Sequence, residues 1–157
     1  MKIRDVVTNN RKKQFFITNR AGQEYSFPYQ KVDPQPNSSN RIQEVYVDKE
    51  LGCEAFTYIL ESGLEGSVHI DQVLEYNEDP DYFTDLLTYK LTLEAQKQVG
   101  ISGLSRRELA KRLKTSVPQL YRLLDPANKR KSMKQLIALL HILNCDVDLV
   151  ISEKNVA

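Results

Sequence analysis

Apolar and polar positions alternate with a period of about two in the first part of the chain, which is the pattern of β-strands with one covered face. Aromatic and β-branched residues concentrate in these runs. We therefore predict strands at residues 14–18, 24–27, 43–47, 54–60 and 67–70. Residues 19–22 separate the first two runs and predict a hairpin. Residues 33–40 contain two prolines and five short polar residues, so we predict a loop there. The whole pattern predicts a small antiparallel β-sheet.

After the acidic, proline-containing segment 77–81, the apolar period changes to about 3.6, the period of a helix. We place a domain boundary in this segment. It divides the chain into a small antiparallel β-rich domain of unknown role over residues 1–80 and a helical domain over residues 81–157. The expected fold class is therefore α+β.

Helical periodicity predicts a long helix over residues 83–99 that ends at Gly100, and a later helix over residues 133–144. Residues 146–151 alternate and then run apolar, which predicts a C-terminal strand. A terminal strand needs a partner, and either a symmetry mate in a dimer or the N-terminal sheet would supply one. The sequence leaves both open.

Two short helices with N-terminal caps are predicted between these longer elements. Ser105 is followed three residues later by Glu108, and Ser116 is followed three residues later by Gln119, so each pair fits a capping box. Apolar residues mark the buried side of each helix, namely Leu109, Ala110 and Leu113, then Leu120, Leu123 and Leu124. Only Lys114-Thr115 connects the two helices. The segment from about residue 104 to 124 is therefore predicted to be a helix-turn-helix.

The charge of the chain divides unevenly. Residues 1–80 carry nine Lys or Arg and 13 Asp or Glu, a net charge of −4, whereas the remaining residues have a net charge of +5. Residues 97–134 hold 11 basic side chains against Glu108 and Asp125 alone, a net charge of +9. This asymmetry favours a polyanionic partner for the second domain, although charge alone fits a solvated helical face equally well.

Counted from Arg106, an alanine stands at the fifth position and apolar residues stand at the fourth, eighth, fifteenth and eighteenth. With this spacing, the segment resembles the lambda-repressor-like (Cro/C1, XRE-type) helix-turn-helix family over residues 83–144. The sequence departs from the family at Lys114, where glycine is usual, and at Thr115, where an aliphatic residue is common. A left-handed conformation at Lys114 would cost about 1 kcal/mol relative to glycine, which a folded domain tolerates.

The resemblance implies a small bacterial-type transcriptional regulator that binds double-stranded DNA. Members commonly act as homodimers, so that two recognition helices reach half-sites about 34 to 36 Å apart. Autoregulatory and antitoxin-like roles are both compatible with it.

By the same resemblance, residues 116–122 begin the recognition helix. Gln119 has an amide that can pair with an adenine edge, and Arg122 can reach guanine or a phosphate. Their alternative roles are a capping-box acceptor and a solvated charge. Val117 and Pro118 offer only apolar contact, so the module is better equipped to bind phosphates than to discriminate bases. The candidate DNA-binding residues are Arg106, Arg107, Ser116, Val117, Gln119, Tyr121, Arg122, Lys129, Arg130 and Lys131, of which the last three form a basic loop suited to phosphate contact.

The N-terminal half weakly resembles a small uncharacterised bacterial domain found beside helix-turn-helix modules, including in toxin–antitoxin loci. This implies a toxin-like protein as a second candidate partner. His69 has no nucleophile or carboxylate pattern with it, so we expect a packed or edge histidine and no enzyme. Cys53 and His69 have no recognised metal-ligand spacing, and we expect neither metal nor cofactor.

The main alternative to DNA binding is a protein-interaction adaptor whose helix-turn-helix does not read DNA. Cys53 and Cys145 lie in different predicted elements, and we expect reduced, buried thiols. No run approaches the roughly 18 to 20 apolar residues that a membrane span needs, so we expect a cytoplasmic protein with no membrane partner.

Overall fold

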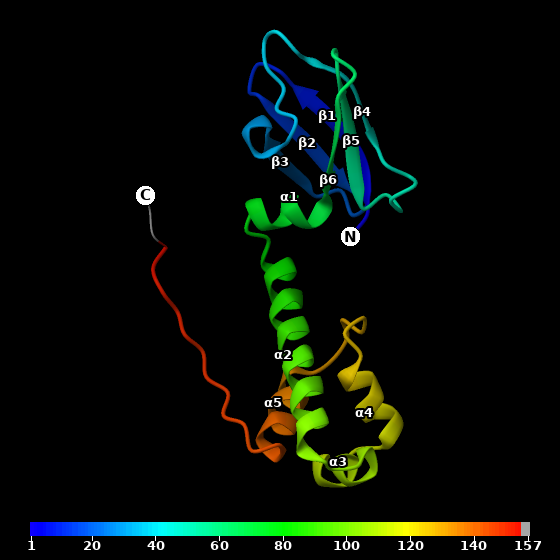
Figure 1. The fold of residues 1–157 in the computed structure, drawn as a ribbon, viewed down its shortest axis with the longest axis vertical. Helices are drawn as coiled ribbons and strands as arrows, with labels where there is room; N and C mark the ends of the chain where they lie inside the picture. The colour runs from blue at the N-terminus through cyan, green and yellow to red at the C-terminus, as the bar shows by residue number, and fades with distance from the viewer. Residues whose placement is uncertain (155–157) are drawn as a thin grey trace. The chain divides into compact units, whose positions relative to one another are not determined.

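The chain has an α+β fold, and this computed structural model describes residues 1–154. The chain divides into two compact units, Met1–Phe83 and the part from Thr84 onward. Figure 1 shows the β-rich first unit and the helical second unit. The division falls within a long helix, α2 (Pro80–Ser102), a few residues beyond the acidic segment where we placed the domain boundary.

The first unit contains two three-stranded antiparallel sheets, where we expected one. Their strands, in spatial order, are β1 (Ile3–Asn9), β2 (Gln14–Asn19) and β3 (Glu24–Pro28), then β4 (Ile42–Val47), β5 (Ala55–Leu60) and β6 (Glu65–His69). β1 was not predicted because its buried residues, Ile3 and Val6, are three positions apart. A register shift between Ile3 and Asp5 brings both onto the covered face.

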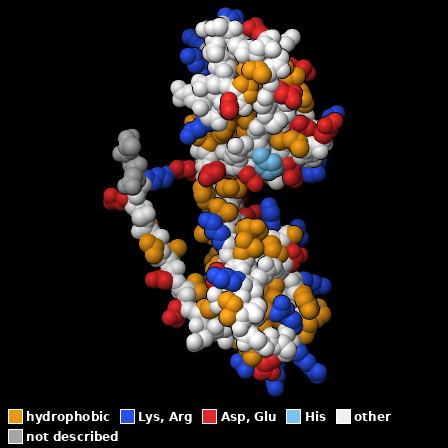
Figure 2. All heavy atoms as spheres, viewed as in Figure 1, with side chains coloured by type: hydrophobic (Ala, Val, Ile, Leu, Met, Phe, Trp, Pro, Cys, Tyr) orange, Lys and Arg blue, Asp and Glu red, His pale blue; other side chains and the backbone are white. Residues whose placement is uncertain are grey.

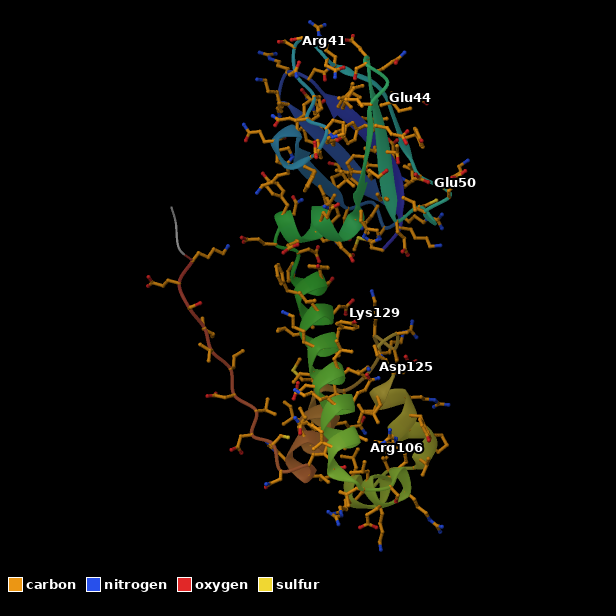
Figure 3. The ribbon with its side chains drawn as sticks, viewed as in Figure 1. Arg41, Glu44, Glu50, Arg106, Asp125 and Lys129 are labelled. Atoms are coloured by element: carbon orange, nitrogen blue, oxygen red, sulfur yellow. The ribbon has the colours of Figure 1, made fainter. Side chains whose placement is uncertain are left out.

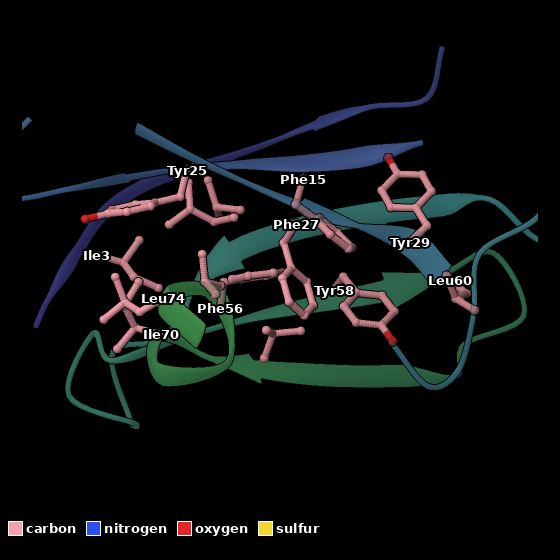
Figure 4. Packing of buried hydrophobic residues seen from close by; sticks show 14 residues of the cluster. Ile3, Phe15, Tyr25, Phe27, Tyr29, Phe56, Tyr58, Leu60, Ile70 and Leu74 are labelled. Carbon is pink, nitrogen blue, oxygen red and sulfur yellow. The ribbon is translucent and has the colours of Figure 1, made fainter. Parts of the chain in front are cut away.

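The two sheets pack face to face around an aromatic core. The ring of Phe15 on β2 lies 4.9 Å from that of Phe56 and 5.4 Å from that of Tyr58, both on β5 (Figure 4). These centroid distances are those of favourable aromatic pairs. Of the aromatic residues in the predicted strands, Phe16 is half-buried and Tyr46 is exposed, whereas the others are buried.

Helix α1 (Ile70–Tyr76) closes one end of this core, although we predicted that a strand would continue through Ile70. The strand ends at His69 because its ring caps the helix: Nδ1 accepts a hydrogen bond from the Asp71 backbone N–H at 3.2 Å. The Gln72 side chain in turn accepts from the His69 N–H at 3.0 Å. His69 is therefore an exposed capping residue.

The second unit is helical. In addition to most of α2, it contains α3 (Arg106–Leu113), α4 (Val117–Leu124) and α5 (Met133–Ile142). Its core joins Ala95 and Val99 of α2 to leucines of the three shorter helices. Helix α2 runs through Gly100, where we expected it to end, because a glycine with negative φ is only mildly unfavourable in a helix. The left-handed residue that follows the helix is Gly103, with φ +67°.

The predicted strand over residues 146–151 does not form within the described part of the chain. Residues 145–154 have no regular structure, and Leu149, Val150 and Ile151 are 72%, 87% and 86% exposed. Alternation favours a strand, but its backbone is satisfied only where a second strand pairs with it. Among the described residues, no helix combines the length and apolarity that would let it cross a membrane.

Candidate nucleic-acid interface

Serine side chains cap both helices of the predicted helix-turn-helix. Ser105 Oγ accepts from the Glu108 N–H at 3.1 Å, and Ser116 Oγ accepts from the Gln119 N–H at 3.3 Å. The reciprocal halves of the two capping boxes are not formed. Glu108 instead pairs with Arg112 Nε at 3.0 Å, and the Gln119 carboxamide has no hydrogen-bond partner among the described residues. The Gln119 amide is therefore free to bind a ligand.

The connection between α3 and α4 is a tight turn. Lys114 adopts the left-handed conformation, with φ 57° and ψ 44°, at the position where glycine was the expected residue. The Thr115 N–H then donates to the carbonyl of Ala110 at 2.9 Å, which closes the end of α3. A left-handed C-cap of this kind sends the chain into the next helix after very few residues.

Helix α4 separates a buried face from an exposed face. Leu120, Leu123 and Leu124 are buried against the helical core. The opposite face presents Pro118, Gln119, Tyr121 and Arg122, with Tyr121 57% exposed. This face combines a free amide, a phenol ring and a guanidinium group, which are the side-chain types that contact base edges and phosphates.

The C-terminal end of α4 is held by side chains that sequence reasoning did not assign to the site. Gln96 Nε2 on α2 donates to the carbonyl of Leu124 at 2.7 Å, and Asn128 Nδ2 donates to that of Arg122 at 3.1 Å. These bonds satisfy helix-terminal carbonyls that have no partner within the helix. No periodicity in the sequence marks either residue, since both act through contacts between elements.

Lys131 also holds the C-terminal end of α4, and its amine points inward and not toward solvent. Its Nζ donates to the Leu123 carbonyl at 3.0 Å, to Thr92 Oγ1 at 3.0 Å and to the Asp125 carbonyl. Burial lowers the pKa of this amine below its usual value, and the nearby Asp125 carboxylate opposes that shift. We therefore leave Lys131 out of the interface, although the sequence grouped it with Lys129 and Arg130.

Most of the other basic side chains around the two helices have no acidic partner. No carboxylate lies within 4.0 Å of the cationic groups of the following described residues: Arg106, Arg107, Lys111, Lys114, Arg122 and Arg130. Lys129 Nζ lies 3.5 Å from the Asp85 carboxylate in an exposed pair. Figure 2 shows Lys and Arg side chains projecting from the end of this unit where α3 lies.

The predicted site residues other than Lys131 thus fall into three groups. Arg107, Gln119, Tyr121, Arg122, Lys129 and Arg130 are exposed, while Arg106 and Val117 are half-buried. Ser116 is exposed but serves as a helix cap. Figure 3 labels Arg106, Asp125 and Lys129. Asp125 lies at the C-terminal end of α4, and Lys129 lies in the loop beyond it.

The remaining observations concern metal binding and the two cysteine thiols. Among the described residues, no group of three or more His, Cys, Asp or Glu side chains is arranged to hold a metal ion. Cys53 and Cys145 are free thiols and are half-buried, where we expected buried ones.

Comparison with protein-family models, with curated proteins and with solved structures finds no significant match to this chain.

Proposed function

We propose that the second unit binds double-stranded DNA through α3 and α4, and that the protein is a bacterial-type transcriptional regulator of the lambda-repressor-like kind. The observation that carries this proposal is the exposed face of α4. Its unengaged Gln119 amide, Tyr121 and Arg122 stand among basic side chains that lack carboxylate partners.

Phosphate binding would supply most of the affinity. Each Lys or Arg that neutralises a phosphate releases condensed counterions, and this release drives association at low salt. An unpaired surface cation needs no ion pair to be broken before it meets a phosphate. Helix α3 and the turn after it supply Arg107, Lys111 and Lys114 for this role, and the loop after α4 supplies Arg130.

Base reading would depend on two side chains of α4. The Gln119 amide can donate and accept, as pairing with an adenine edge requires, and Arg122 can bond guanine in a bidentate manner. Pro118 and Val117 add apolar contact only. We infer sequence-dependent binding in which phosphate contacts contribute more affinity than base contacts. Binding as a homodimer would place a second recognition helix on an adjacent half-site.

The deciding experiment measures fluorescence anisotropy of a labelled duplex with the full chain as the salt concentration rises. With these four phosphate contacts, affinity should fall roughly a hundredfold between 50 and 200 mM salt. Selection of bound fragments from genomic DNA would then reveal the preferred sequence. An absence of duplex binding at 50 mM salt would contradict the proposal and favour the adaptor role.

A further inference from the structure

The first unit contains a cavity of about 570 Å³ that the proposed DNA-binding function does not use. Its walls come from the β1–β2 turn, from the short 3-10 helix η1 (Tyr29–Lys31) and from residues 35–42. Figure 3 shows Arg41 at the tip of this unit. The cavity lies wholly within the first unit, so its structure can be described without reference to the helical one.

The cavity lining is cationic although the unit around it is acidic. Arg11, Lys13 and Arg41 line it, and no Asp or Glu does. None of these three cations has a carboxylate within 4.0 Å among the described residues. The Glu61 carboxylate binds the main chain of Arg41 and not its guanidinium group, since Oε2 accepts from the Arg41 backbone N–H at 3.2 Å. Three unneutralised cations around one cavity create a positive potential that favours an anion.

Neutral hydrogen-bonding side chains supply most of the rest of the lining, and Pro36 and Ile42 add apolar surface. The hydrogen-bonding side chains can both donate and accept or carry a hydroxyl, namely Asn10, Gln30, Gln35, Asn37 and Ser38. Tyr29 is buried, with its ring packed on Phe15, so it offers no open face for stacking. The lining therefore matches a ligand with hydroxyl or heteroatom groups beside its negative charge.

The walls are fixed by hydrogen bonds to the sheets. Tyr58 on β5 donates to the Pro34 carbonyl at 2.7 Å, which holds the loop that carries the carboxamides. Tyr29 Oη donates to Asn10 Oδ1 at 2.9 Å, and the Tyr29 N–H donates to the Lys13 carbonyl at 3.0 Å. A cavity whose walls are anchored in this way loses little conformational entropy when a ligand enters.

We propose that this cavity binds a small organic phosphate, such as a nucleotide. Arg11, Lys13 and Arg41 contact its phosphate groups, and the carboxamides contact its hydroxyl or ring heteroatoms. A cavity of this volume lies within the usual range of small-molecule sites. The site makes the first unit a ligand-binding module, and this assignment is independent of what the helical unit binds.

The test is isothermal titration calorimetry on the full chain, with inorganic pyrophosphate, adenosine diphosphate and a short DNA duplex as separate probes. We expect one pyrophosphate or nucleotide per chain. The double variant Arg11→Ala, Arg41→Ala should weaken that binding at least tenfold. The matched control is Arg20→Ala, Lys49→Ala, which removes the same charge from turns at the opposite ends of the strands. The control should bind as the parent protein does.

Three outcomes would overturn the proposal. One is the absence of heat with both phosphate probes at millimolar concentration. Another is an equal decrease in affinity in both double variants, which would show a general charge effect. The third is weaker duplex binding by the Arg11→Ala, Arg41→Ala variant when the parent protein binds neither small phosphate. The cations of the cavity would then bind the phosphates of a nucleic acid and not those of a small molecule. All four substituted residues are exposed. Circular dichroism in the amide region checks that each variant is folded.

Discussion

Lys131 Nζ lies 3.0 Å from Thr92 Oγ1, and this bond ties the loop after α4 to helix α2. The same amine donates to the carbonyl of Leu123 near the end of α4. Thr92 is fully buried, and its hydroxyl donates to the Thr88 carbonyl at 2.8 Å. Lys131 thus connects three segments and fixes where α4 ends, so it is a positioning residue for the proposed recognition helix.

Replacing Lys131 with Met should destabilise the helical unit. The change leaves the Leu123 carbonyl without its side-chain donor, while the Thr92 hydroxyl keeps its bond to the Thr88 carbonyl. An unsatisfied buried group costs about 1 to 3 kcal/mol. We expect a lower midpoint of urea unfolding, followed by helical circular dichroism, together with weaker duplex binding. The two effects share a cause, because α4 is then less firmly oriented.

Lys134→Met is the matched control, since Lys134 is exposed on α5 and its amine forms no hydrogen bond or ion pair with the described residues. It should shift stability by no more than about 0.5 kcal/mol. If Lys131→Met left the unfolding midpoint unchanged while duplex affinity fell, Lys131 would be a phosphate-binding residue, as the basic triplet in the sequence suggested.

The two short helices α3 and α4 and the turn between them were predictable because their signals are local. Ser105 and Ser116 sit at the caps, and the leucines follow at helical spacing, so the bounds of α3 and α4 agree with the sequence. The prediction of a C-terminal strand was wrong. A strand forms only where a second strand pairs with it, and the alternation of residues 146–151 carries no information about such a partner. The inward position of Lys131 was not predicted for a related reason. Two of its acceptors are main-chain carbonyls, and every residue has one, so no residue type in the sequence marks them.

Gln119 and Arg122 should control which duplex is bound. Replacing both with Ala should reduce discrimination between the preferred and a scrambled duplex, by about 1 to 3 kcal/mol per base that is no longer read. Replacing Lys129 and Arg130 should weaken all duplexes alike and lower the salt slope by about one per phosphate that is no longer neutralised. Anisotropy titrations with both duplexes distinguish the two effects. An equal decrease in discrimination from both pairs of substitutions would contradict these roles.

Gly66 on β6 lies opposite Tyr58 on β5, and this pairing leaves no space for a side chain. A Cβ at residue 66 would lie 2.6 Å from Tyr58 Cζ and 2.9 Å from the Asp33 carbonyl. Gly66→Ala should therefore displace the phenol from Pro34, destabilising the first unit by about 1 to 3 kcal/mol. Hydrogen exchange of the β5 amides measures this destabilisation.

Gly100 provides the contrasting substitution, because a Cβ there meets no atom within 4 Å and its φ is negative. Gly100→Ala should slow exchange along α2, with an increase in stability of about 0.5 to 1 kcal/mol. A neutral effect of Gly66→Ala would mean that the Tyr58 ring moves without cost. The bond that holds the cavity loop would then be unimportant.

Lys114→Gly should stabilise the helical unit, because Lys114 carries a left-handed backbone that glycine adopts without strain. The increase in stability should be about 1 kcal/mol. The same substitution at Lys111, inside α3, should instead destabilise by about 1 kcal/mol, since glycine is unfavourable in a helix interior. Each variant removes one cation, so their opposite unfolding shifts isolate the backbone effect from charge. A decrease in stability with Lys114→Gly would show that the lysine side chain contributes more to the turn than its strained conformation costs.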